Sequence, residues 1–400
     1  MTSRERILAA VRRQTSDRVP LDLGGTESSG VTGIAWHNLA RRLCADAPTP
    51  PEVVEPFQQV VRIGEDLHAR FGIDTIALFI EPREWKPGAL GDGSPCLLPV
   101  LWNEKIYANG DRILFDAHGR PVAKMPKGGF YYDAIDAPLA ACTSSADVEK
   151  HRAAIEAFDL PWFCDEPVGA TAARARKYHA AGKAVVFNLC CHFLAAGTSL
   201  RGYEQFLVDM MCEKPLAEAI LDVLLECYIK RIDRYACLKD AVDVVLFNDD
   251  LGTQHGPLIS PDVYRTLIKP RQARLFEYAK KKLDAPVLFH SCGAVSAFIR
   301  DLVEAGVDAL NPVQVGAEGM DSARLKKEFG KDICFWGGGC DSQKVLARGT
   351  PEDVKNEVKK RFDDFAPGGG FVFTQVHNIQ PDVPPDNIIA MLDTASELRG

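Results

Sequence analysis

The sequence predicts an α/β protein built as a (β/α)8 TIM barrel with an antiparallel β insertion between its second and third strands. Two observations lead to this prediction. Eight short, near-continuously apolar segments recur along the chain, and segments with helical periodicity separate most of them. Strands buried on both faces have this composition, and their alternation with helices is typical of a parallel sheet with right-handed crossovers. We therefore expect one barrel domain over residues 1–400.

The eight predicted strands are short enough for a barrel. They cover residues 19–23, 74–80, 184–190, 242–248, 285–290, 307–313, 332–338 and 370–376.

Apolar residues at spacings of three and four predict the helices between the strands. These helices cover residues 33–45, 56–71, 146–157, 168–181, 212–238, 260–283, 294–305, 321–329, 351–365 and 385–398. Ser260-Pro261 and Thr350-Pro351 are typical helix starts, since each places a capping hydroxyl before a first-turn proline.

Residues 96–137 interrupt the alternation. Apolar and polar residues alternate there, and Asn109-Gly110 and His118-Gly119 are typical of tight turns. We expect an antiparallel insertion folded over the barrel mouth.

Composition excludes several classes of protein. The formal net charge of -8 argues against nucleic acid as a partner. No apolar run is long enough to cross a membrane, and the N-terminus lacks the apolar core of a signal peptide. A cytoplasmic location is expected, and the twelve cysteines are expected to be thiols.

In a TIM barrel the active site lies at the C-terminal ends of the strands. The fifth predicted strand delivers His290 and Cys292 to that end, on one face of the extended backbone. Cys340 follows the seventh strand after three glycines. One nitrogen and two sulfurs suit zinc, and three protein ligands leave one position open for catalysis. The alternative is that these are three unrelated buried residues.

Other strand ends supply further candidates. Asp249 and Asp250 are adjacent carboxylates after the fourth strand, and the sequence does not tell which of them faces the site. His377 is a third candidate catalytic residue. The predicted substrate pocket comprises Asn188, Gln314, Trp336 and Tyr131, with core packing as an alternative for the aromatic residues. A rival metal-binding cluster is Cys190-Cys191-His192.

Several motifs resemble the uroporphyrinogen decarboxylase superfamily. They are "FNDDLG", "ISPDVYRTLIKPR", "LFHSCGAV", "LVEAGVDALNPVQ", "FWGGGCD", "GTPEDV" and "HNIQPDVPPDN", and "RERILAAVRRQTSDRVPLDLGG" fits the family's N-terminus. The resemblance covers nearly the whole chain and is strongest after residue 240. It implies a (β/α)8 barrel.

The superfamily has two functional branches. Its decarboxylases carry an N-terminal arginine-rich signature, whereas the matching loop here, "GGTESSGVTG", has no arginine. The other branch comprises zinc-dependent methyltransferases that work with methylated corrinoids. His290, Cys292 and Cys340 match that branch's H-x-C and later C pattern.

The resemblance therefore implies a methyltransferase that uses Zn2+ and cobalamin. It would move a methyl group between a small methylated or methoxylated substrate, or a thiol, and cobalamin, with the demethylase direction favoured. No D-x-H-x-x-G corrinoid motif is present, so the cobalamin would arrive on a corrinoid protein or free. A homodimer is common in the superfamily. Two alternatives remain: a metal-independent decarboxylase and a non-catalytic tetrapyrrole-binding barrel.

Overall fold

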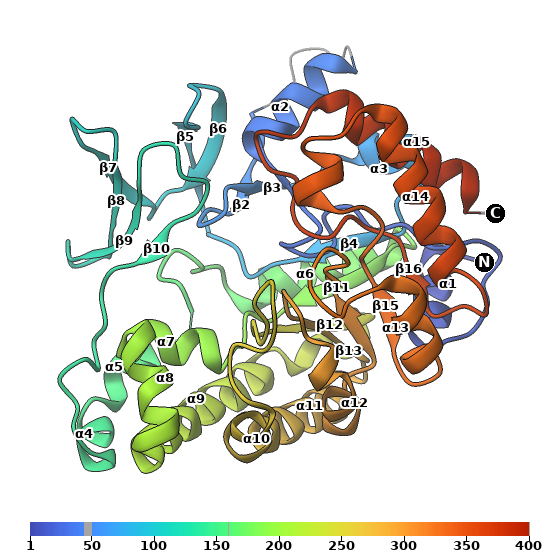
Figure 1. Cartoon of the computed structure of the whole chain (residues 1–400). Coiled ribbons are helices and arrows are strands. Elements are labelled where there is room, and N and C mark those ends of the chain that lie inside the picture. Colours follow the sequence, from blue (N-terminus) through green and yellow to red (C-terminus); the bar gives the residue numbers. More distant parts are fainter. Residues whose placement is uncertain (44–49, 159, 400) are drawn as a thin grey trace.

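The computed structural model describes residues 1–43, 50–158 and 160–399, and its centre is a curled parallel sheet (Figure 1). Its seven strands follow each other in chain order across the sheet. They are β4 (Thr75–Leu78), β11 (Ala184–Asn188), β12 (Val244–Asn248), β13 (Val287–His290), β14 (Ala309–Asn311), β15 (Cys334–Trp336) and β16 (Phe371–Val372). The predicted TIM-barrel type of fold is thus confirmed.

The first predicted strand lies between the two edges of this sheet. Leu21 forms a parallel bridge with Phe373, and Asp22 N donates to Phe373 O at 2.9 Å. On the other side, Asp74 N donates to Leu21 O at 2.8 Å. Residues 20–22 therefore connect β16 to the segment that leads into β4, as an eighth strand would.

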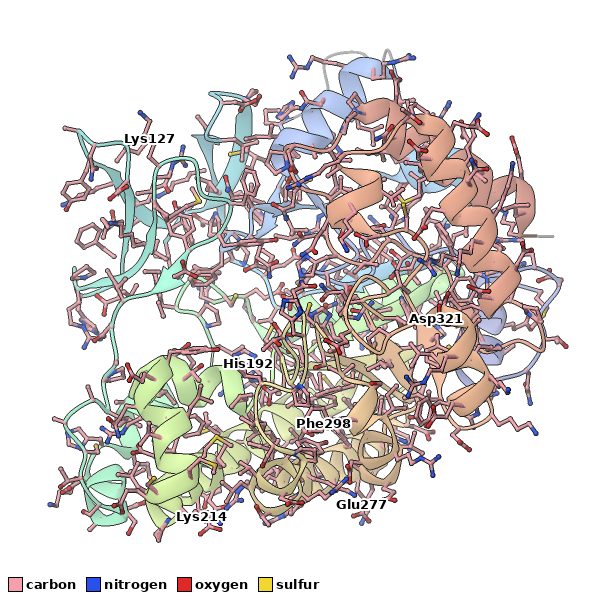
Figure 2. The ribbon with its side chains drawn as sticks, viewed as in Figure 1. Lys127, His192, Lys214, Glu277, Phe298 and Asp321 are labelled. Carbon is pink, nitrogen blue, oxygen red and sulfur yellow. The ribbon has the colours of Figure 1, made fainter. Side chains whose placement is uncertain are left out.

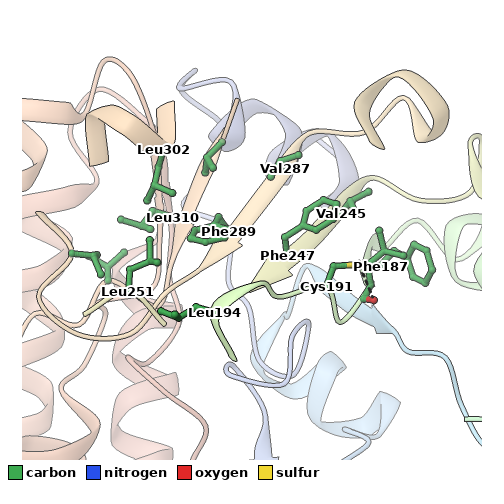
Figure 3. Close-up of a cluster of buried hydrophobic side chains, with 14 of the residues drawn as sticks. Phe187, Cys191, Leu194, Val245, Phe247, Leu251, Val287, Phe289, Leu302 and Leu310 are labelled. Carbon is green, nitrogen blue, oxygen red and sulfur yellow. Dashed lines mark hydrogen bonds between the residues drawn. The ribbon is translucent and has the colours of Figure 1, made fainter. Parts of the chain in front are cut away.

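Alternate residues of the strands pack into two separate apolar layers. The inner layer includes Val186, Val244, Leu288 and Val372, together with residues of α1 (Ser3–Val11). The outer layer lies between sheet and helices and includes Phe187, Val245 and Phe289, whose side chains Figure 3 shows together with those of Cys191 and Leu194. Apolar runs in the sequence reflect this burial on both faces.

Helices of the described residues cover the outside of the sheet (Figure 1). After α1 they are α2 (Gly33–Arg42), α3 (Glu65–Phe71), α4 (Ser145–Lys150), α5 (Arg152–Ala157), α6 (Val168–Ala180), α7 (Leu194–Arg201), α8 (Tyr203–Cys212), α9 (Lys214–Arg234), α10 (Pro261–Val263), α11 (Lys269–Leu283), α12 (Ile299–Ala305), α13 (Ser322–Phe329), α14 (Pro351–Phe365) and α15 (Pro385–Leu398). Short 3-10 turns are η1 (Ala236–Leu238) and η3 (Ser296–Phe298), and π-helical turns are η2 (Tyr264–Ile268) and η4 (Ser342–Leu346). No helix of the described residues is long and apolar enough to cross a membrane.

The antiparallel insertion lies between β4 and β11, as predicted, but begins earlier than residue 96. Its strands are β5 (Trp85–Ala89), β6 (Pro95–Pro99), β7 (Asn103–Ile106), β8 (Arg112–Phe115), β9 (Pro121–Met125) and β10 (Asp133–Ala134). β5 pairs only with β6, whereas β7–β10 form a four-stranded sheet. Figure 1 shows the insertion on the same side of the barrel as α7 and α8.

One helix prediction was wrong over part of its length, and two helices were not predicted. Residues 56–71 are helical only from Glu65, because β3 (Val60–Val61) pairs with both β1 (Val31–Thr32) and β2 (Val53–Glu55) in a small sheet. The valines of these segments favour such strands. Helices α7 and α8 were not predicted. The last two residues of the helix predicted over 33–45 lie outside the described residues.

Candidate metal centre at the barrel mouth

The inner face of the barrel changes from apolar to polar at the strand ends. Along β11, β12, β13 and β14 the inner apolar residues are followed, two positions later, by Asn188, Asn248, His290 and Asn311. The strand register places Asn248 opposite His290 and His290 opposite Asn311. A polar layer therefore closes the inner core on the side where barrel enzymes carry their active sites.

Three potential metal ligands come together above this layer. The donor atoms of His290, Cys292 and His377 lie within 4.8 Å of one another. His290 Nε2 is 3.4 Å from Cys292 Sγ, and the two imidazole rings meet edge to face with centroids 5.9 Å apart. The predicted pair at the end of β13 is thus joined by the histidine that follows β16.

A side-chain amide fixes the tautomer of His290. Its Nδ1 lies 2.6 Å from Asn311 Oδ1, while Asn311 Nδ2 donates to Trp336 O at 2.9 Å. Because the amide oxygen accepts only, Nδ1 must carry the hydrogen. The lone pair of Nε2 is then free to bind a metal, and a histidine ligand is usually oriented in this way.

His377 is held by a similar arrangement. Its Nδ1 lies 3.0 Å from Asn378 Oδ1, and Asn378 Nδ2 donates to Gln58 Oε1 at 2.7 Å. Tyr131, from the insertion, also donates its hydroxyl to Asn378 Oδ1 at 3.3 Å. The second imidazole therefore also presents Nε2, and the insertion reaches the mouth through Tyr131.

Burial sets the protonation of two of the three potential ligands. It raises the pKa of the Cys292 thiol well above its usual value, with the charge of Asp250 adding to the effect. Burial, followed by the charge of His290, lowers the pKa of His377 to about 4. His377 is therefore neutral near pH 7, whereas Cys292 keeps its proton until a cation replaces it.

The two adjacent aspartates have different roles. Asp250 Oδ1 accepts from Cys292 N at 2.8 Å and lies 3.7 Å from His290 Nε2, so Asp250 faces the cluster. Asp249 is buried, and its carboxylate accepts from the backbone nitrogens of Phe193, Leu194 and Ala195 at the start of α7. Burial raises the pKa of Asp249 to about 7. Asp249 therefore caps a helix, and Asp250 is the aspartate at the site.

Cys340, predicted as the third metal ligand, lies elsewhere in this structure. Its side chain is fully buried in the outer apolar layer, near Glu357 and Arg361 of α14. The preceding Gly337 and Gly338 have φ angles of 129° and 69°, which break the strand geometry before Cys340. Among the described residues, His377 takes the third place in the cluster.

The residues of the predicted pocket lie in different environments. Asn188 is buried, and Gln314 is held by Gly293 N at 2.7 Å. Trp336 is fully buried inside the barrel, where its Nε1 donates to Asp22 Oδ2 at 2.7 Å. Trp336 is therefore a packing residue, whereas Tyr131 lies at the mouth and is 36% exposed.

The three residues of the rival cluster, 190–192, lie in different environments. Cys191 packs in the outer layer. Cys190 has a φ of 53°, and burial, followed by the charge of Glu27, raises the pKa of its thiol well above the usual value. His192 lies next to the start of α7, and burial lowers its pKa to about 4 (Figure 2). The three side chains do not form a group of metal ligands among the described residues.

Two carboxylates at the mouth were not singled out from the sequence. Glu27 Oε1 accepts from Asn248 Nδ2 at 2.9 Å. Burial raises the pKa of Glu27, and the nearby charge of His290 lowers it by less. Burial, then the charge of Glu27, raises the pKa of Glu55 to about 8. Glu27 could have been found by its place after the first strand. Glu55 could not, because no strand was predicted over residues 53–55, where β2 holds it.

A parallel barrel with histidine, cysteine and carboxylate side chains gathered at its strand ends defines an α/β-barrel enzyme. A family model described as "Uroporphyrinogen decarboxylase (URO-D)" matches residues 186–398. The chain therefore belongs to the uroporphyrinogen decarboxylase family, which confirms the resemblance noted from its motifs.

Curated relatives match about half of the chain. A uroporphyrinogen decarboxylase from Legionella pneumophila (strain Lens) is 24% identical over 213 residues, which are 53% of this chain and 56% of the relative. One from Geobacillus kaustophilus (strain HTA426) is 29% identical over 200 residues, 50% of this chain and 53% of the relative. The chain thus spans about half the length of the curated relatives it matches.

Among solved structures, a methyltransferase from Methanosarcina mazei is similar over 99% of both chains. The TM-score is 0.60 and the sequence identity 18%. At this identity the match shows a shared fold.

Proposed function

We propose that this protein is a zinc-dependent methyltransferase that moves a methyl group between a small substrate and cobalamin carried on a corrinoid protein. The observation that carries the proposal is the cluster of His290, Cys292 and His377. Two imidazoles, each with its Nδ1 hydrogen held by an asparagine, and one thiol are a donor set that suits Zn2+. Fold similarity to a methyltransferase supports the same reading.

The residues fit a catalytic rather than a structural metal. Three protein ligands leave a fourth position for substrate, and the mouth of a barrel is accessible to it. His290 and His377 would bind through Nε2 and Cys292 through Sγ. When bound, zinc would supply Lewis acidity that favours the anionic form of a thiol or of a leaving oxygen or sulfur.

The protein's own groups would prepare this site. Asn311 and Asn378 keep the two Nδ1 hydrogens in place. Asp250 Oδ1, 3.7 Å from His290 Nε2, is placed to exchange a proton with the substrate: it would accept one from a thiol, or return one to a leaving oxygen or sulfur. We favour the demethylase direction, in which the carbon–heteroatom bond breaks, its electron pair stays on the heteroatom, and the methyl carbon gains the electron pair of cob(I)alamin.

The competing candidate is decarboxylation, because the curated relatives carry the name uroporphyrinogen decarboxylase. The loop after residue 23 has no arginine to hold a carboxylated substrate, and it places Glu27 at the mouth instead. The absence of an arginine there supports methyl transfer over porphyrinogen decarboxylation.

One experiment separates the two candidates. Purified protein is assayed for zinc content, for methyl transfer between cobalamin and a panel of thiols and methoxylated compounds, and for decarboxylation, before and after chelation. The proposal expects about one zinc per chain and methyl transfer that chelation abolishes and zinc restores. Decarboxylation that survives chelation, without methyl transfer, would overturn it.

A further inference from the structure

Hydrogen-bond donors from segments far apart in the chain meet at Asn378, the residue that holds the imidazole of His377. Tyr131, from the insertion, donates its hydroxyl to Asn378 Oδ1 at 3.3 Å. Gln380 Nε2 donates to the Tyr131 oxygen at 2.8 Å and also to Asn378 Oδ1. Asn378 is only 1% exposed, so protein donors rather than water decide which way its amide points. A reversed amide would place its NH2 against these donors, so they keep Oδ1 directed at His377 Nδ1.

The turn between β2 and β3 holds the same asparagine from its other end. Gln58 Oε1, in this turn, accepts from Asn378 Nδ2 at 2.7 Å. The residue before it carries the insertion, because Tyr132 N donates to Phe57 O at 3.0 Å. The insertion therefore reaches Asn378 twice, directly through Tyr131 and indirectly through this turn.

The insertion is stabilised by an apolar cluster of its own. That cluster is separate from the two layers of the barrel and includes Trp102, Leu114, Ala123 and Met125. Figure 1 shows β7–β10 set apart from the parallel sheet. The contact at the mouth can therefore be weakened by removing one hydroxyl while the insertion keeps its own core.

We propose that Tyr131 is a positioning residue for the metal ligand His377, and that it couples the contact between insertion and barrel to zinc binding. It acts through Asn378, which keeps the Nδ1 hydrogen of His377 in place and leaves Nε2 for the metal. This inference rests on the zinc site of the proposed function. Coupling between two equilibria is reciprocal, so zinc strengthens the insertion's contact by the factor by which that contact strengthens zinc binding.

Zinc affinity, measured by competition with a chromophoric chelator, tests the positioning role. We expect Tyr131→Phe to bind zinc about three- to tenfold more weakly than wild type, less than for loss of Asn378 itself, because Gln380 still donates to the asparagine. The melting temperature of the zinc-free variant is measured alongside, since a merely structural role would lower it without changing zinc affinity.

Tyr107→Phe is the matched control. It removes the same hydroxyl from a tyrosine in the turn between β7 and β8 of the insertion, where Tyr107 is 49% exposed. Its zinc affinity should stay within about twofold of wild type.

Hydrogen exchange on the wild-type protein tests the reciprocal effect without any substitution. The amide of Tyr132, which donates to Phe57 O, reports contact between insertion and barrel, whereas the amide of Tyr107, which donates to Asp111 O, lies within the insertion. We expect zinc to slow exchange at Tyr132 about three- to tenfold and to leave Tyr107 unchanged. In Tyr131→Phe the effect of zinc on Tyr132 should be lost.

The outcomes separate this inference from the function on which it rests. Equal zinc affinity in Tyr131→Phe and wild type, or an equal loss in Tyr107→Phe, would overturn the positioning role and leave the metal site standing. Exchange at Tyr132 that does not respond to zinc would overturn the coupling. A wild-type protein that binds no zinc would contradict both the proposed function and this inference.

Discussion

His290 and Asn311 face each other across neighbouring strands, with 2.6 Å between His290 Nδ1 and Asn311 Oδ1. Ser28 also donates its hydroxyl to Asn311 Oδ1 at 2.7 Å, so strand β14 and the loop after residue 23 both orient one imidazole. Because Asn311 engages Nδ1, His290 at the end of β13 can offer only Nε2 to a metal.

Removal of the asparagine should weaken metal binding without removing a ligand. We expect Asn311→Ala to lower zinc affinity about 10- to 100-fold, because His290 loses the acceptor that fixes its tautomer. Competition with a chromophoric chelator measures this change.

Asn387→Ala is the control for loss of a buried amide, since Asn387 bonds Leu346 O and Gly349 O away from the cluster. It should lower the melting temperature and leave zinc affinity unchanged. Equal zinc affinity in the Asn311 variant and wild type would contradict the role of Asn311.

Metal affinity should depend on pH through one proton. Between pH 7.5 and 9 His377 is already neutral, because its pKa is about 4, whereas Cys292 is protonated because burial raises its pKa. Zinc must displace the thiol proton, so the logarithm of the affinity should rise by about one per pH unit.

Chelator competition across this pH range gives the slope. Cys292→Ser should bind zinc more weakly and with a smaller slope. A wild-type affinity that does not change with pH would show that the thiol is not a ligand.

Substitutions at the two neighbouring aspartates should affect different properties, stability at Asp249 and activity at Asp250. Asp249→Ala should lower the free energy of unfolding by about 1–3 kcal/mol, because three backbone N–H groups at the start of α7 lose their acceptor. Zinc content should be unchanged.

Asp250→Asn should do the reverse, with little change in stability, because the side chain is 58% exposed, and with reduced methyl transfer. Urea denaturation and turnover on the same preparations make the comparison. A loss of zinc in the Asp249 variant with unchanged stability would contradict the assigned roles.

Substitutions of Cys340 and of Cys292 should differ in their effect on zinc content. Cys340→Ala should retain zinc and lose about 1 kcal/mol of stability, because its side chain is buried in the outer apolar layer. Cys292→Ala should lose zinc. Loss of zinc in the Cys340 variant would return that residue to the ligand set that its sequence motif suggested.

Much of the fold was predictable because burial on both faces leaves a clear pattern. Residues such as Val186 and Phe187 are adjacent yet pack in different layers, so the strand reads as a continuous apolar run. The small sheet at residues 31–61 was less predictable, since its strands are two or three residues long and depend on contacts distant in sequence.

The candidate site was predictable where a regular strand leads into it. His290 ends β13, and the two-residue alternation correctly places Cys292 beside it. That alternation fails after Trp336, because Gly337 and Gly338 adopt positive φ angles and the direction of the Cys340 side chain no longer follows from its position. The approach of His377 to His290 depends on closure of the barrel.

The most direct test of the metal centre is diffraction from crystals of the zinc-containing protein on both sides of the zinc absorption edge. We predict one anomalous peak within bonding distance, about 2.0–2.3 Å, of His290 Nε2, Cys292 Sγ and His377 Nε2. A peak beside Cys340, or no peak at the cluster in crystals that contain one zinc per chain, would contradict this account.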